Sequence, residues 1–149
     1  MKTLSPKQMA CSLPVTFLVH QLEEYFCQFP LWYSKLLNAQ LSNQDFILIN
    51  GIGLLVFTAF ALSYIINKNK LILAALGTLV FVNGAIHLLL SVVTVTYSPG
   101  TISGVVLFIP LGIIIFRELF PELHGGERIM AIAIGIFVLL PVSLIAFTI

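Results

Sequence analysis

The sequence has little charge. Only 9% of its 149 residues are Asp, Glu, Lys or Arg, 59% are hydrophobic, and the formal net charge is +1. A soluble domain carries about 25% charged residues, so this composition predicts a polytopic membrane protein with the lipid bilayer as a partner. The chain has no basic stripe and a net charge of only +1, and we therefore expect no nucleic-acid partner.

Cysteine is also scarce, since the chain has only Cys11 and Cys27. If both lie on one helix, they are about 24 Å apart at 1.5 Å per residue, which is too far for a disulfide. The sequence also lacks an internal repeat, a low-complexity tract and a linker between domains. We expect a single domain over residues 1–149.

Long apolar runs dominate the rest of the chain, and each is close to the roughly 20 residues that a bilayer core requires. They predict an all-α bundle of five transmembrane helices at about residues 13–30, 46–66, 71–95, 99–116 and 129–149. Pro110 lies inside the fourth segment and predicts a kink. Gly51 and Gly53 in the second segment could belong to a nucleotide-binding motif, but that motif needs a third glycine and a preceding strand, and the sequence has neither. We therefore expect these glycines to allow close helix packing.

The basic residues predict the orientation of the chain. With five crossings, six of the seven basic residues lie on one side of the membrane, and only Lys35 lies on the other. If segment 13–30 did not cross, Lys2 and Lys7 would change sides and the split would be four to three. Because positive residues collect on the cytoplasmic side, we expect a cytoplasmic N-terminus and a C-terminus outside.

The first segment carries charge at membrane depth. His20, Glu23 and Glu24 lie in the otherwise apolar segment 13–30. A carboxylate at the bilayer centre costs about 2.5–3.5 kcal/mol on insertion scales, so two adjacent ones indicate a functional site. In the third segment, Asn83 and His87 are four residues apart and share a helix face.

These polar residues are expected at one depth. The first and third helices run in the same direction, with His20 and Asn83 near their middles. Glu24 and His87 follow about 6 Å further outward, and Tyr97 comes directly after the third helix on the same side. We therefore predict one shared pocket between the midplane and the outer surface.

The start of the fourth segment adds a feature to this side. Ser98 is a suitable N-cap, and Pro99 suits the first helical position. The free N–H groups of this helix start could hold an anionic or carbonyl oxygen. Gly100 and Gly104, four residues apart, allow another backbone to approach closely.

Three short motifs occur in order along the chain. H-x-x-E-E runs from His20 to Glu24, N-x-x-x-H from Asn83 to His87, and Y-S-P-G from Tyr97 to Gly100. This order resembles the HXXEE-domain family of small membrane proteins over about residues 15–115. That family is named for its motif and not for an activity, so the resemblance implies which residues matter and implies no reaction.

Two kinds of chemistry fit the polar residues. In the first, His20, Glu23, Glu24 and His87 bind a divalent metal, with zinc or non-haem iron favoured by two imidazoles and carboxylate oxygens. In the second, the neighbouring carboxylates act as acid and base without a metal and isomerise, cyclise or hydrolyse a lipophilic substrate. The candidate catalytic residues in either case are Glu23, Glu24, His20, His87, Asn83 as a positioning group, and Tyr97 as a contact for the polar head of the substrate.

A non-enzymatic role is the alternative. The His/Glu/Asn network would then be structural, or it would carry protons or metal ions. Hydrogen bonds between membrane helices average about 0.6 kcal/mol, which is less than the cost of inserting two carboxylates. That comparison favours the enzymatic interpretation and leaves the alternative open.

Overall fold

The computed structural model describes the backbone of residues 4–38 and 40–148, and side chains as far as residue 139. These residues are helical apart from short turns, and no β-strand occurs among them. The elements in chain order are α1 (Pro6–Phe26), α2 (Phe29–Leu37), α3 (Asn43–Asn67), α4 (Lys70–Thr94), α5 (Thr101–Ser103), the π-helix η1 (Gly104–Phe108), α6 (Ile109–Leu119), the 3-10 helix η2 (Phe120–Glu122) and α7 (Gly125–Thr148).

The first expected helix is in fact two. α1 begins at Pro6, where Ser5 and the Gln8 side chain form a capping box, and it ends at Phe26. The chain then turns through Gln28, whose φ of 59° is left-handed, and Pro30 occupies the first turn of α2. Proline is accepted in the first turn of a helix, and the left-handed turn at Gln28 separates α2 from α1. The single helix predicted over residues 13–30 was therefore wrong.

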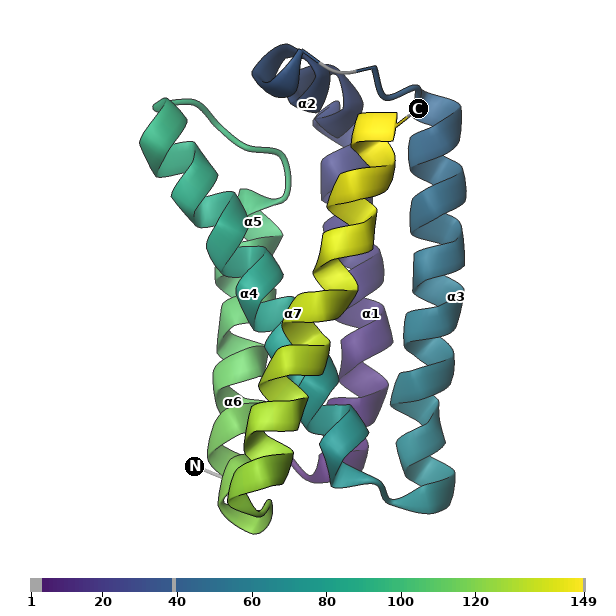
Figure 1. Ribbon diagram of the computed structural model, residues 1–149, viewed down its shortest axis with the longest axis vertical. Helices are drawn as coiled ribbons and strands as arrows, with labels where there is room; N and C mark the ends of the chain where they lie inside the picture. The colour runs from purple at the N-terminus through teal and green to yellow at the C-terminus, as the bar shows by residue number, and fades with distance from the viewer. Residues whose placement is uncertain (1–3, 39, 149) are drawn as a thin grey trace.

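α2 lies across one end of the bundle, called here the α2 end (Figure 1). The long helices run between the α2 end and the opposite end, where the α3–α4 and α6–α7 turns lie. α1 begins at the opposite end, and α7 finishes at the α2 end.

Helix α4 is the centre of the packing. It crosses the bundle obliquely (Figure 1) and contacts α7, α6, η1 and α3. Eight consecutive residues, Leu73–Val80, are buried, as expected of a helix that is surrounded on all sides. The core around it includes Leu13, Phe57, Phe108 and Ile115.

The fourth expected helix is continuous over residues 101–122 but changes its pitch. η1 is a π-helical stretch that ends two residues before Pro110. The first turn of this helix packs closely on α4, where a Cβ on Gly84 would lie 2.8 Å from the carbonyl oxygen of Gly104. The close approach predicted at Gly104 is therefore present. By contrast, a Cβ on Gly51 or Gly53 would meet nothing within 4 Å, so the close packing predicted there was wrong.

Three helices among the described residues are long and apolar enough to cross a membrane: Asn43–Asn67, Lys70–Thr94 and Thr101–Glu122. These three agree closely with the second, third and fourth predicted segments. The fifth predicted segment corresponds to α7, which starts earlier, at Gly125; Ile149 lies outside the described residues.

Candidate metal and acid/base site

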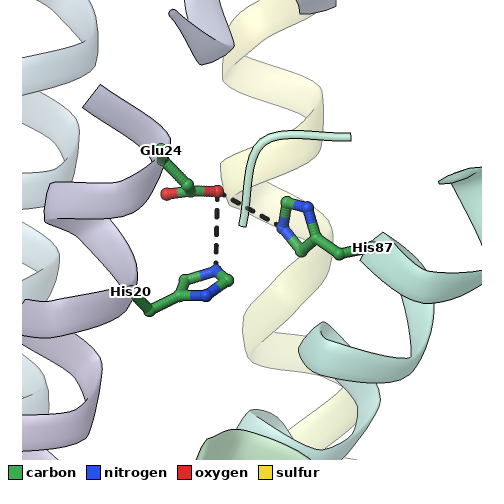
Figure 2. A group of neighbouring side chains, drawn as sticks. All are labelled: His20, Glu24 and His87. Carbon is green, nitrogen blue, oxygen red and sulfur yellow. Dashed lines mark ion pairs between the residues drawn. The ribbon is translucent and has the colours of Figure 1, made fainter. Parts of the chain in front are cut away.

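Two histidines and one glutamate meet near the α2 end. His20 and Glu24 are one turn apart on α1 and face His87 on α4 (Figure 2). One carboxylate oxygen of Glu24, Oε1, lies 3.6 Å from Nε2 of His20 and 3.3 Å from Nε2 of His87. All three side chains are buried, at 2%, 7% and 5% exposure for His20, Glu24 and His87.

Each histidine is held through its other ring nitrogen. Nδ1 of His20 lies 2.8 Å from the hydroxyl of Ser103, and Nδ1 of His87 lies 3.2 Å from the hydroxyl of Ser98. Both serines are buried, and they come from the segment that links α4 to η1. The two imidazoles are thus fixed with Nε2 pointing at the Glu24 carboxylate.

The Ser103 contact indicates which nitrogen of His20 carries the proton. The Ser103 hydroxyl donates to the Gly100 carbonyl at 3.4 Å, so its oxygen is free to accept a hydrogen bond from Nδ1–H of His20. Nε2 of His20 is then unprotonated, and it has no hydrogen-bond partner among the described residues. A histidine arranged in this way, with Nδ1–H donated to an oxygen, is typical of a metal ligand.

The spacing of the donor atoms also suits a metal ion. Each of the three residues offers a ligand atom, and these atoms all lie within 4.8 Å of one another. Ligands around a tetrahedral zinc ion are about 3.4 Å apart, given metal–ligand bonds near 2.1 Å. The two Glu24–histidine distances fall on either side of that value.

A glycine closes one side of the cluster. A Cβ on Gly100 would lie 2.8 Å from Cε1 of His20 and 2.9 Å from Cε1 of His87, and its φ is +101°. The ring of Phe108 stacks on His20, with a centroid distance of 4.3 Å. Gly100 and the two serines therefore hold the histidine rings, a role that the sequence analysis did not assign to them.

Glu23 does not join this cluster. Its carboxylate accepts hydrogen bonds from the backbone N–H groups of Gly100 at 3.1 Å, Ile102 at 2.9 Å and Ser103 at 2.6 Å. Glu23 thus supplies the anionic oxygen that was expected at this helix start. The helix itself begins at Thr101 with Gly100 as the N-cap, so the cap predicted at Ser98 and Pro99 was two residues early.

Tyr97 contacts Glu23 and not the His20/Glu24/His87 cluster. Its hydroxyl donates to Glu23 Oε1 at 2.5 Å and lies 3.7 Å from the sulfur of Cys27. Desolvation and the hydrogen bond to Glu23 raise the pKa of the Tyr97 phenol above its ordinary value. The hydroxyl therefore remains protonated and serves as a fourth donor to the Glu23 carboxylate.

A cavity of about 650 Å³ lies beside the cluster. His20, Glu24 and His87 line it together with Asn83, whose buried Oδ1 has no hydrogen-bond partner among the described residues. Gln21 lines it too and donates to the Asn50 carbonyl at 2.8 Å. The volume is within the range of small-molecule sites, and most of the wall is apolar, as in such sites.

The fold and the cluster define a class: an all-helical protein with helices of membrane-spanning length and a buried His/Glu/His group beside an apolar cavity. The sequence profile of a family described as "Protein of unknown function with HXXEE motif" matches residues 11–115. The chain belongs to this family, as its motifs predicted. No curated protein and no solved structure matches it.

Proposed function

We propose that this protein is an integral membrane enzyme that binds one divalent metal ion at His20, Glu24 and His87 and acts on a lipophilic substrate in the adjoining cavity. Five segments cross the bilayer: α1, α3, α4, the helix over residues 101–122, and α7. Three of these segments are long and apolar enough to cross a membrane, which supports this arrangement. α1 and α7 run alongside these three segments, which supports it as well (Figure 1).

The α2 end faces the outside in this proposal. The basic side chains at the opposite end are Lys7, Lys68, Lys70, Arg117 and Arg128. Lys35 on α2 is the basic residue at the α2 end. Because basic residues collect on the cytoplasmic side, the N-terminus is cytoplasmic and the metal site lies in the outer half of the bilayer.

One observation carries the metal proposal: two imidazole nitrogens and a carboxylate oxygen face one another in a buried site, and Nε2 of His20 has no hydrogen-bond partner among the described residues. Three electron-pair donors at such short range repel one another unless a proton or a metal ion lies among them, and a metal ion engages all three at once. A set of two histidines and one carboxylate also leaves a coordination position open, which is typical of catalytic rather than structural zinc.

The residues around the bound ion have different roles. A metal in this position supplies a Lewis acid and lowers the pKa of a bound water. His20, Glu24 and His87 would hold it, while Ser103 and Ser98 orient the two imidazoles through their Nδ1 atoms. Asn83, one turn before His87, lines the cavity, and its amide would contact a polar group of the substrate.

Metal-free acid/base chemistry is the second candidate, and the 3.3 Å contact between Glu24 and His87 favours it. A proton shared by this pair would make one partner an acid and the other a base within reach of the cavity. The unpartnered Nε2 of His20 is what this candidate leaves unexplained, and we rank it second for that reason.

Elemental analysis of the detergent-purified protein, prepared without a histidine tag, tests the proposal. We expect about one equivalent of zinc or iron in the wild type and in His124→Ala, which removes an exposed histidine outside the cluster. The same metal should be absent from His87→Ala. A wild type without metal rejects the metal site and leaves the acid/base candidate.

A further inference from the structure

Gln21 lines the cavity beside the cluster and is hydrogen-bonded to α3. It follows His20 directly on α1 and is three residues before Glu24, and only 8% of it is exposed. Glu24 meets His87 of α4, whereas Gln21 meets Asn50 of α3. Helix α1 therefore presents the cluster and Gln21 to two different walls of one cavity.

The orientation of the Gln21 amide follows from its partners. Nε2 of Gln21 lies 2.8 Å from the backbone carbonyl oxygen of Asn50 and 3.2 Å from Oδ1 of the same residue. A carbonyl oxygen only accepts hydrogen bonds, so the group that faces it is the NH₂ and not the oxygen. Asn50 is oriented in the same way, since its Nδ2 donates to the Phe46 carbonyl at 3.0 Å, and its Oδ1 is left to accept from Gln21.

The NH₂ group of Gln21 is thus used within the protein, and its oxygen is not. Oε1 of Gln21 has no hydrogen-bond partner among the described residues. Unlike Oδ1 of Asn83, it is not fully enclosed by the protein. A buried acceptor without a donor is unfavourable, so this oxygen is available to a donor group of a molecule in the cavity.

The surroundings favour a donor without charge. In the proposed function a divalent metal ion lies at His20 and Glu24, close to Gln21, and most of the cavity wall is apolar. Burial of a cationic ammonium group in such a site is costly, and the neighbouring metal ion would repel it. A hydroxyl or an amide N–H meets the same acceptor without either cost.

We propose that Gln21 is a substrate-binding residue and that the substrate carries a neutral hydrogen-bond donor, a hydroxyl or an amide N–H, which donates to Oε1. Residues three apart on a helix have Cβ atoms about 5–6 Å apart, so this donor lies close to the group that reacts at Glu24. Contacts on two walls of the cavity fix the orientation of the substrate. The inference rests on the proposed function for the reaction, and on the cavity and the free amide oxygen for the binding.

The test compares lipophilic probes that have the donor with partners in which methyl groups replace its hydrogen atoms. The pairs are oleyl alcohol and its methyl ether, cholesterol and its methyl ether, and oleamide and its N,N-dimethyl derivative. The shape of the lipid thus varies independently of the donor. Equilibrium binding of the radiolabelled probes to detergent-purified protein measures the preference within each pair.

Three variants separate the acceptor from the packing. Gln21→Met removes the acceptor and keeps a side chain of similar length. Gln44→Met is the matched control, because Gln44 is exposed and does not line the cavity. Asn50→Leu removes one hydrogen bond between α1 and α3, but the backbone carbonyl of Asn50 still holds the Gln21 amide.

We expect the wild type and Gln44→Met to bind the donor member of at least one pair about 3–10-fold more tightly than its methylated partner. Gln21→Met should lose this preference, because its thioether cannot replace the amide oxygen as an acceptor. Asn50→Leu should keep the preference, since Oε1 of Gln21 remains in place.

A wild type without a preference in any pair would overturn the inference, whether or not Gln21→Met folds. A preference that persists in Gln21→Met would overturn it as well. Loss of the preference in both Gln21→Met and Asn50→Leu would assign the effect to helix packing and overturn it too.

The metal content of the same samples separates this inference from the metal proposal. A preference that depends on Gln21 in a protein without metal supports the binding inference and rejects the metal site. A protein that contains metal but shows no preference does the reverse.

Discussion

Glu23 and Glu24 are neighbours on α1, yet their carboxylates serve different parts of the molecule. Glu24 faces His20 and His87, and Glu23 accepts hydrogen bonds from Tyr97 and from three backbone N–H groups at the start of the helix over residues 101–122. The H-x-x-E-E motif therefore joins a candidate reactive carboxylate to one that ties α1 to this helix.

The first prediction compares Glu24→Gln with Glu23→Gln. Glu24→Gln keeps the shape of the side chain but removes its charge, so we expect the protein to stay folded. Its metal affinity should fall by more than the roughly 10–100-fold that is typical when a hydrogen-bond partner of a ligand is lost. Glu23→Gln weakens charge-assisted hydrogen bonds worth about 1.5–3 kcal/mol; we expect a lower thermal unfolding midpoint with metal still bound. Elemental analysis and thermal unfolding in detergent measure both. The opposite pattern would assign the metal to Glu23 and the structural role to Glu24.

The second prediction concerns the serines behind the histidines. Ser103→Ala and Ser98→Ala each remove the partner of one Nδ1, and loss of such a partner lowers metal affinity by about 10–100-fold. Zinc competition titration with a chelator measures the change. Ser63→Ala is the control, because the Ser63 hydroxyl donates to the Phe60 carbonyl of its own helix and has no other partner among the described residues. Unchanged affinity in both test variants would show that the serines do not orient the ligands.

The third prediction concerns the glycine against the imidazoles. Gly100→Ala places a methyl group within 3 Å of both histidine rings and adds a residue with a side chain at φ +101°. Strained backbone of this kind costs about 1–3 kcal/mol, so we expect reduced stability together with reduced metal content. Gly125→Ala is the control, since a Cβ there meets nothing within 4 Å. A Gly100→Ala protein with wild-type metal content would argue against the observed contact.

The fourth prediction tests the orientation in the membrane. In a chain that carries Cys11→Ser and Cys27→Ser, Lys35→Cys should react with a membrane-impermeant maleimide added to intact cells. His124→Cys lies at the other end of the bundle, so it should react only after the cells are permeabilised. The reverse labelling pattern would invert the topology, and labelling of both from outside would contradict five crossings.

Much of the fold could be predicted from local sequence patterns. The apolar runs predicted helices close to α3, α4 and the helix over residues 101–122, because a bilayer core fixes the length of a crossing helix. The spacing of His20 and Glu24 placed both on one face of α1, since residues four apart on a helix are neighbours. The run from Leu13 to Pro30 predicted one helix, and only the left-handed turn at Gln28 divided it.

The tertiary structure decided what these faces meet. His20 and Ser103 are 83 residues apart in sequence, and Glu23 and Ser103 are 80 apart, so neither contact is contained in a local spacing. They form because the Gly84–Gly104 contact lets the helix over residues 101–122 approach α4 and present its first turn to α1. By itself the sequence predicted three long apolar helices, the family and the polar residues of its motifs. Packing of the helices decided that Glu24, and not Glu23, meets the histidines, and that Gly53 faces a cavity and not another helix.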